Sequence, residues 1–216
     1  MTAIRQLLKH GRGRTLFGQR IEQTWSSLWV IERLLADYEP DRIVELGTGG
    51  GMLARYLKQY VELSNNVNPA KLLTIDLDTS KAQVSPIKAD KNDLRVDIWQ
   101  VDIHEPKTLK AVARFMRECG RIFQCDPPCS DPIERPFLIV DGADPKSFEV
   151  NLYAPHMPAG CPIFAHDCQL DGVTSKKPGW CFVESQIDWQ HVERFEPYYS
   201  MSVEMDTRML CLRKKL

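Results

Sequence analysis

An apolar run that passes directly into a glycine-rich turn stands at Arg42–Gly51. Its Ile, Val and Leu residues are typical of a buried strand. Gly47, Gly49 and Gly51 allow the backbone to turn sharply and to approach a ligand closely, because a Cβ there would cause strain or a clash. A helical pattern follows the turn, so this segment predicts the first unit of an α/β sheet with a cofactor at the turn.

The spacing of these glycines discriminates between cofactors. A dinucleotide fingerprint G-x-G-x-x-G counted from Gly47 requires glycine at the position of Met52. NAD is therefore disfavoured, and S-adenosylmethionine becomes the leading candidate.

Strand-like and helix-like segments alternate along the rest of the chain. The predicted strands are 43–46, 72–75, 96–101, 137–140 and 162–165, and the predicted helices are 21–37, 52–60, 106–119 and 145–157. Two β-like runs in the tail, 191–195 and 208–212, are expected to form an antiparallel hairpin at the sheet edge. This order predicts an α/β fold, with a doubly wound, mostly parallel, seven-stranded Rossmann-like sheet, helices on both faces and an antiparallel C-terminal strand.

Length and composition favour one soluble domain over residues 1–216. We expect 1–20 to form a basic capping arm, which is either a solvated face or a lid, and 120–136 to form a long loop containing Pro and Cys. The net charge of −1 lacks the basic excess of a nucleic-acid binder. No apolar run is long enough to cross a membrane and no secretion signal is recognisable, so we predict a cytoplasmic protein, with homo-oligomerisation left open.

The seven cysteines are an odd number in a chain of this size, which favours reduced thiols. Cys119, Cys125 and Cys129 are close enough in sequence to hold zinc with one further ligand. The spacing lacks a second Cys pair, so free cysteines are the favoured interpretation.

Acids follow the second and third predicted strands, at the sheet edge where ligands of open α/β sheets bind. Asp76 can accept hydrogen bonds from ribose hydroxyls, with Asp78 as its competitor, and Asp102 can accept from an adenine amino group while Ile103 lies against the ring. The alternative for each acid is a solvated loop residue or a helix cap.

Asp141, His166 and Asp167 follow two later strands and form a second predicted cluster. Two carboxylates and an imidazole can bind magnesium or another divalent metal, which would acidify a hydroxyl substrate. Without a metal, the two acids would cap helices and His166 would serve as a general base or a satisfied loop histidine. His104, just beyond Asp102, is expected to be a solvated loop residue, with a base that faces the pocket as the alternative.

Read together, these residues resemble the class I methyltransferase fold, and more narrowly its cephalosporin hydroxylase-like family. The resemblance spans about residues 15–175, and its strongest match is the glycine turn. It is carried by Phe17-Gly18-x-x-Ile21-x-Gln23, 40–51, 74–78, 139–144, 152–155, Gly160 and 164–167.

The resemblance implies that Glu45, Gly47, Thr48, Gly49, Gly51 and Asp76 contact S-adenosylmethionine, with Asp102 and Ile103 at the adenine. It also places Asp141, His166 and Asp167 where relatives, and enzymes similar to catechol O-methyltransferase, bind magnesium. Those relatives carry an acid pair, or an acid followed by an amide, where this chain has His166-Asp167 or Asp167-Cys168.

We therefore expect methyl transfer from S-adenosylmethionine to an oxygen, or secondarily a nitrogen, of a small molecule such as a sugar or natural product, with or without a divalent metal. Asp141, His166 and Asp167 are the expected catalytic residues. The alternatives are a redox enzyme or a non-catalytic accessory protein that binds a cofactor on the same fold.

Overall fold

The computed structural model describes residues 15–16, 19–20, 23–63, 70–81, 96–117, 135–142, 145–171 and 182–216. Its centre is a seven-stranded sheet in which β11 runs antiparallel to both of its neighbours and all other pairs are parallel. Across the sheet the strands are β10 (Val192–Arg194), β11 (Leu210–Lys214), β7 (Pro162–Ala165), β6 (Pro136–Val140), β3 (Arg42–Leu46), β4 (Lys71–Asp76) and β5 (Val96–Gln100). The predicted sheet is confirmed, including its antiparallel C-terminal strand.

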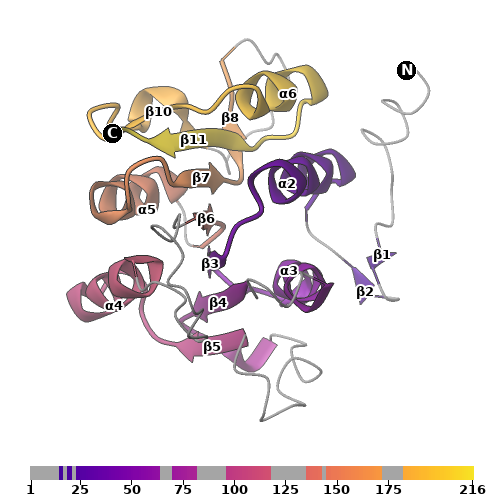
Figure 1. The fold of residues 1–216 in the computed structure, drawn as a ribbon, viewed down its shortest axis with the longest axis vertical. Helices are drawn as coiled ribbons and strands as arrows, with labels where there is room; N and C mark the ends of the chain where they lie inside the picture. The colour runs from indigo at the N-terminus through magenta and orange to yellow at the C-terminus, as the bar shows by residue number, and fades with distance from the viewer. Residues whose placement is uncertain are drawn as a thin grey trace, which may run out of the picture.

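Helices cover both faces of the sheet (Figure 1). One face carries α2 (Trp25–Tyr38), α3 (Met52–Leu63) and α6 (Tyr198–Met205), and the other carries α4 (Pro106–Arg117) and α5 (Lys146–Tyr153). The short elements are β1 (Thr15–Leu16) with β2 (Gln19–Arg20), β8 (Cys168–Gln169) with β9 (Phe182–Val183), and the 3-10 turns η1 (Thr79–Lys81), η2 (Ala154–His156) and η3 (Glu184–Gln186). None of the described helices combines the length and the apolar character needed to cross a membrane.

The two central strands, β3 and β6, are buried along their whole length. A parallel strand covered by helices on both faces must be apolar on both sides, which explains the continuous runs Ile43-Val44 and Phe137–Val140. Each such side chain contributes about 1.5–3 kcal/mol by burial. This buried core fixes the positions of the carboxyl ends of β3 and β6.

The helix predicted at 21–37 begins later, at Trp25, because Thr24 forms its N-cap. The Thr24 hydroxyl accepts a hydrogen bond of 3.0 Å from the backbone N–H of Ser27. Glu39 ends the helix in the left-handed conformation, at a φ of 46°, just before Pro40. Gln23 therefore lies outside the helix, in the segment that leads into it.

Three further expectations need correction. The two tail strands pair antiparallel as predicted but are not a direct hairpin, because α6 connects them and β11 inserts between β10 and β7. The helix predicted at 145–157 is α5 followed by η2, where Pro155 cannot donate the next helical hydrogen bond. Pro136 begins β6 instead of ending the preceding loop.

Several expectations lie outside the described residues. They concern most of the capping arm 1–20, the loop 120–136 up to residue 134, and Cys119, Cys125 and Cys129. Cys161, Cys168 and Cys211 are buried, and none of them forms a disulfide within the part of the chain that the structure describes.

Candidate functional site

The order of the strands reverses at β3, because the chain first builds β4 and β5 on one side and then crosses to β6 on the other. In open α/β sheets such a switch point leaves a crevice beyond the carboxyl ends of the strands. Glu45 and the glycine turn end β3, and Asp141 follows β6 directly. Both predicted clusters therefore meet at one sheet edge.

The glycine turn combines one tightly packed position with two open ones. Gly47 has a φ of +92°, and a Cβ built there would lie 2.3 Å from the carbonyl oxygen of Asp141. A Cβ on Gly49 or Gly50 would meet nothing within 4 Å. Gly47 is thus required for β3 and β6 to approach each other, while Gly49 and Gly50 leave open space over the backbone, which suits a ligand that approaches closely. Gly51, also at positive φ, closes the turn by donating to the carbonyl of Thr48 at 2.7 Å.

Asp76 ties the end of β4 to the glycine turn. Its Oδ2 accepts a hydrogen bond of 2.8 Å from the N–H of Gly49, and its Oδ1 accepts one of 3.1 Å from Asp78 N–H. The Asp78 carboxylate instead accepts from Ser80 N–H at 2.9 Å. Of the two competing acids, Asp76 is the one held at the turn, and each of its oxygens keeps a further lone pair for a ligand.

Glu45 and Thr48 lie beneath the turn, and their side chains are buried. The Thr74 hydroxyl donates to Glu45 Oε2, and it lies 2.6 Å from the Thr48 hydroxyl. Burial raises the pKa of Glu45 to about 8, because the Thr74 hydrogen bond only partly offsets the desolvation and the charges of Asp141 and Asp76 add to it. Glu45 is thus a buried acid directly below the turn that stays mostly in its neutral form near pH 7.

The predicted adenine end follows β5. Asp102 is partly exposed, and its Oδ1 accepts a hydrogen bond of 2.8 Å from His104 N–H. Ile103 is buried and its carbonyl accepts a 2.6 Å bond from the Tyr153 hydroxyl. His104 lies in the turn with a 39% exposed side chain. Its Nε2 is 3.8 Å from Oε1 of the buried Glu149, and its ring packs edge-on against Phe148, so it is not simply solvated.

Asp141, His166 and Asp167 come together as predicted, because β6 and β7 are parallel neighbours. One ligand atom from each lies within 4.8 Å of the others. Nδ1 of His166 is 3.5 Å from Asp141 Oδ1 and 3.4 Å from Asp167 Oδ1. The alternative, in which these acids cap the helices that follow, does not hold for Asp141. The N-cap position of α5 is occupied by Pro145, and no side chain forms a capping hydrogen bond there.

Three partners of this cluster were not predicted from the sequence. Gln23 Nε2 donates to Asp141 Oδ2 at 2.6 Å. Lys146 Nζ lies 3.2 Å from Asp167 Oδ2 and 3.7 Å from Asp141 Oδ1, and Arg208 Nη2 lies 2.6 Å from Asp167 Oδ1. Gln23 belongs to the motif 17–23 that carries the family resemblance, but the motif assigns it no contact, and Lys146 and Arg208 stand in no recognisable motif.

These contacts set the charges of the cluster. Desolvation lowers the pKa of His166, but the attraction of Asp141 and hydrogen bonds to Asp141 and Asp167 outweigh it and raise that pKa to about 9. Burial of Asp167 alone would raise its pKa, yet His166, Lys146 and Arg208 together hold it well below its usual range. At neutral pH the imidazole is charged, and its buried Nε2 has no hydrogen-bond partner among the residues the structure describes.

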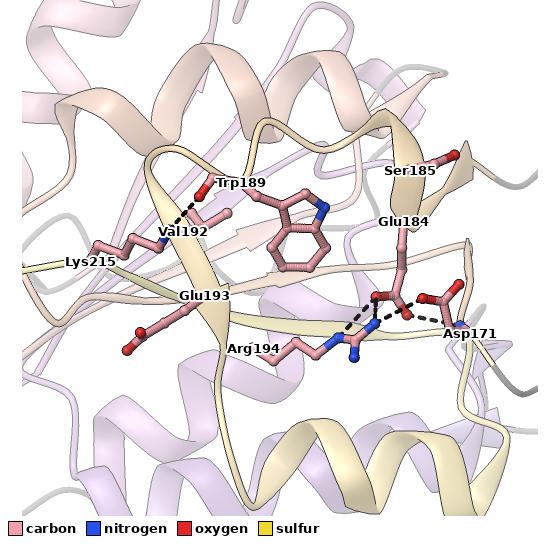
Figure 2. A pocket seen from close by; sticks show the side chains of 8 residues that line it. All are labelled: Asp171, Glu184, Ser185, Trp189, Val192, Glu193, Arg194 and Lys215. Carbon is pink, nitrogen blue, oxygen red and sulfur yellow. Dashed lines mark hydrogen bonds and ion pairs between the residues drawn. The ribbon is translucent and has the colours of Figure 1, made fainter.

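A cavity of about 430 Å³ lies elsewhere, along the β10 edge of the sheet (Figure 2). Its charged groups have partners within the chain. Arg194 bonds to Glu184 and Asp171, each at 2.8 Å, Glu193 pairs with Arg213, and Lys215 Nζ donates to the Trp189 carbonyl at 2.6 Å. Glu184 is almost fully buried and also accepts a 2.6 Å bond from the Tyr199 hydroxyl. This arrangement joins η3, β10 and α6, which is a structural role.

Comparison with solved structures identifies the fold. The chain is similar to CmcI in its apo form, with a TM-score of 0.61 and 13% identity over 98% of this chain and 83% of that chain. It is also similar to CmcI described as holding Mg and S-adenosylmethionine, with a TM-score of 0.58 and 15% identity over 94% and 77%, and to CmcI with S-adenosylhomocysteine, with a TM-score of 0.57 and 14% identity over 96% and 88%. No protein-family model matches the sequence, and no curated protein matches it significantly. The chain therefore has the class I methyltransferase fold that its sequence motifs resemble.

Proposed function

We propose that this chain transfers the methyl group of S-adenosylmethionine to an oxygen, with nitrogen as the secondary choice, of a small molecule. The observation that carries the proposal is the meeting of two sites at one sheet edge. The open turn at Gly49 and Gly50 lies next to the Asp141 cluster, because Gly47 in the same turn packs closely against the backbone of Asp141. The shared fold with CmcI, whose structures hold S-adenosylmethionine or its product, supports the choice of cofactor.

The glycine turn and the acids after β4 and β5 fit this cofactor. Gly49 and Gly50 leave room for it against the backbone, Asp76 at the turn can accept from ribose hydroxyls, and Asp102 is exposed enough to accept from the adenine. Glu45 lies below the turn, where its ionised form, which predominates above its pKa of about 8, would attract a sulfonium cation.

S-adenosylmethionine supplies an activated methyl group, so the protein mainly has to align the acceptor and accept its proton. Alignment alone can supply about 7–11 kcal/mol of the barrier. Asp141 is the cluster residue in backbone contact with the glycine turn, and Gln23 and His166 hold its two carboxylate oxygens. We assign Asp141 to accept a hydrogen bond from the acceptor hydroxyl, which holds that hydroxyl in line with the methyl group, and to take its proton as the methyl group is transferred. His166 and Asp167 complete the polar surface.

A divalent metal fits the cluster in the number and spacing of ligand atoms. It fits less well in its surroundings, since both acids already contact the ammonium of Lys146 and imidazole is a poor ligand for magnesium. No catalytic step assigned here depends on a metal.

Asp141→Asn tests the assignment, because it keeps the size of the side chain and removes its charge. Turnover of an accepted substrate should fall by about 10²–10⁴-fold while the affinity for S-adenosylmethionine stays near that of the wild type. Calorimetry with S-adenosylmethionine, S-adenosylhomocysteine and NAD, each with and without magnesium, measures the binding. Heat with NAD and none with the two sulfur ligands would favour the redox alternative, and full turnover by the variant would remove Asp141 from the site.

A further inference from the structure

Lys146 occupies an unusual position for a lysine, because its side chain is only 6% exposed and lies between two carboxylates. Its ammonium is 3.7 Å from Asp141 Oδ1 and 3.2 Å from Asp167 Oδ2. Lys146 is the first residue of α5, and the extended Pro145 before it sets the direction in which the helix begins. The cation is therefore placed by the fold, at the junction of β6 and α5.

The remaining oxygens of both acids also have partners within the chain. Asp167 Oδ1 contacts Arg208 at 2.6 Å, and Asp141 Oδ2 accepts from Gln23 at 2.6 Å. Arg208 comes from the segment before β11 and is tied to the sheet edge by its carbonyl, which accepts a 2.9 Å bond from Cys168 N–H. All four carboxylate oxygens thus contact a donor of this chain.

A magnesium ion shared by these acids would need one oxygen of each at about 2.0–2.1 Å. Lys146 already contacts one oxygen of each acid, Asp141 Oδ1 and Asp167 Oδ2, and its ammonium lies between the two carboxylates where such an ion would have to bind. An ammonium and a divalent cation repel each other strongly at such distances in a buried site, so one excludes the other. Imidazole is moreover a poor ligand for magnesium, which prefers oxygen.

We propose that Lys146 takes the place of a divalent cation in this cluster, so that an ammonium bridges Asp141 and Asp167 and the site works without metal. The inference rests on the proposed function in one respect, that the acceptor hydroxyl binds at this cluster. Lys146 is then a positioning residue that holds the two carboxylates together, with Arg208 as the second counter-ion of Asp167.

Binding of Mn²⁺, followed by the EPR signal of the free ion, tests the proposal without any assay of turnover. The wild type should bind no stoichiometric Mn²⁺ at concentrations up to about 1 mM. Lys146→Met removes the charge while keeping a side chain of similar length. This variant should have one Mn²⁺ site that binds the ion at least about tenfold more tightly than the wild type does. Adding Asp141→Asn should abolish that new site. Lys107→Met, which removes an exposed lysine paired with Glu105, is the matched control and should bind as the wild type does.

One stoichiometric Mn²⁺ bound by the wild type and lost in Asp141→Asn would overturn the proposal. A folded Lys146→Met variant, judged by circular dichroism, that gains no Mn²⁺ would also overturn it. If Lys146→Met does not fold, Lys146→Gln and the wild-type titration give the same decision. The Mn²⁺ titrations do not depend on S-adenosylmethionine. Failure of the proposed methyl transfer would appear instead as the absence of a heat of binding for S-adenosylmethionine in calorimetry, so the two failures can be told apart.

Discussion

Glu45 and Glu184 are equally inaccessible, at 1% and 2% exposed, but their surroundings are opposite. Glu184, near the β10 edge, accepts from Arg194, from the Tyr199 hydroxyl and from the backbone N–H of Asp171. Glu45, at the end of β3, has the Thr74 hydroxyl as its donor, and no cation among the described residues forms an ion pair with it.

The difference supports our proposal that Glu45 serves a ligand, whereas Glu184 joins parts of the chain. A buried carboxylate without a cation costs folding free energy, and natural chains retain such a cost mainly at functional sites. Glu45 stands below the turn where we propose that a sulfonium cation binds, while Glu184 stands where three chain segments need to be joined. The acids and bases beside the cavity at Glu184 pair within the chain, whereas Glu45 has no counter-ion among the described residues.

The largest expected effect is on stability at the β10 edge. Glu184→Ala leaves Tyr199 and the N–H of Asp171 without their acceptor, and should lower the free energy of unfolding by about 3 kcal/mol. Urea unfolding followed by tryptophan fluorescence measures it. Glu193→Ala is the control, since its pair with Arg213 is exposed, and should change the stability by less than about 0.5 kcal/mol. Equal losses in both variants would show that burial of Glu184 carries no special weight.

An intermediate effect is expected in the pH dependence of stability at Glu45. The folded pKa of about 8 lies above the unfolded value of 4.5, so the folded state holds the extra proton and loses stability as pH rises between these values. Glu45→Gln removes that loss. Between pH 6 and pH 8 the free energy of unfolding of the variant should therefore rise by about 2–3 kcal/mol relative to that of the wild type, since one titrating proton changes it by about 1.36 kcal/mol per pH unit. Parallel stability curves for the two proteins would contradict the assigned pKa.

The smallest effect concerns the charge of the ligand. Near pH 9 the ionised Glu45 should favour S-adenosylmethionine over its neutral product, S-adenosylhomocysteine. Glu45→Gln should then weaken the sulfonium ligand about tenfold and the product much less. Calorimetric titration of both ligands measures the ratio. The same loss for both would mean that Glu45 supports the shape of the turn and not the charge of the ligand.

Much of this site was predictable because its signals are local. The glycine turn, the acids Asp76 and Asp141, and the pair His166-Asp167 each follow an apolar strand, and parallel strands bring their carboxyl ends to one edge. Their catalytic and binding roles stay predictions until the variants above are measured. The tail was harder, because α6 between β10 and β11 carries no strong pattern of one apolar face.

The sequence by itself determined the strand, turn and helix pattern, since hydrophobic periodicity and glycine conformation act over neighbouring residues. Tertiary structure alone decided which charges meet. Gln23, Lys146 and Arg208 come from segments far apart in the chain, and they reach Asp141 and Asp167 because α5 begins beside β6 and β11 inserts next to β7. Pairing of buried charges depends on strand order and helix placement, which no short motif encodes, and here that pairing bears on whether a metal or a lysine holds the two carboxylates together.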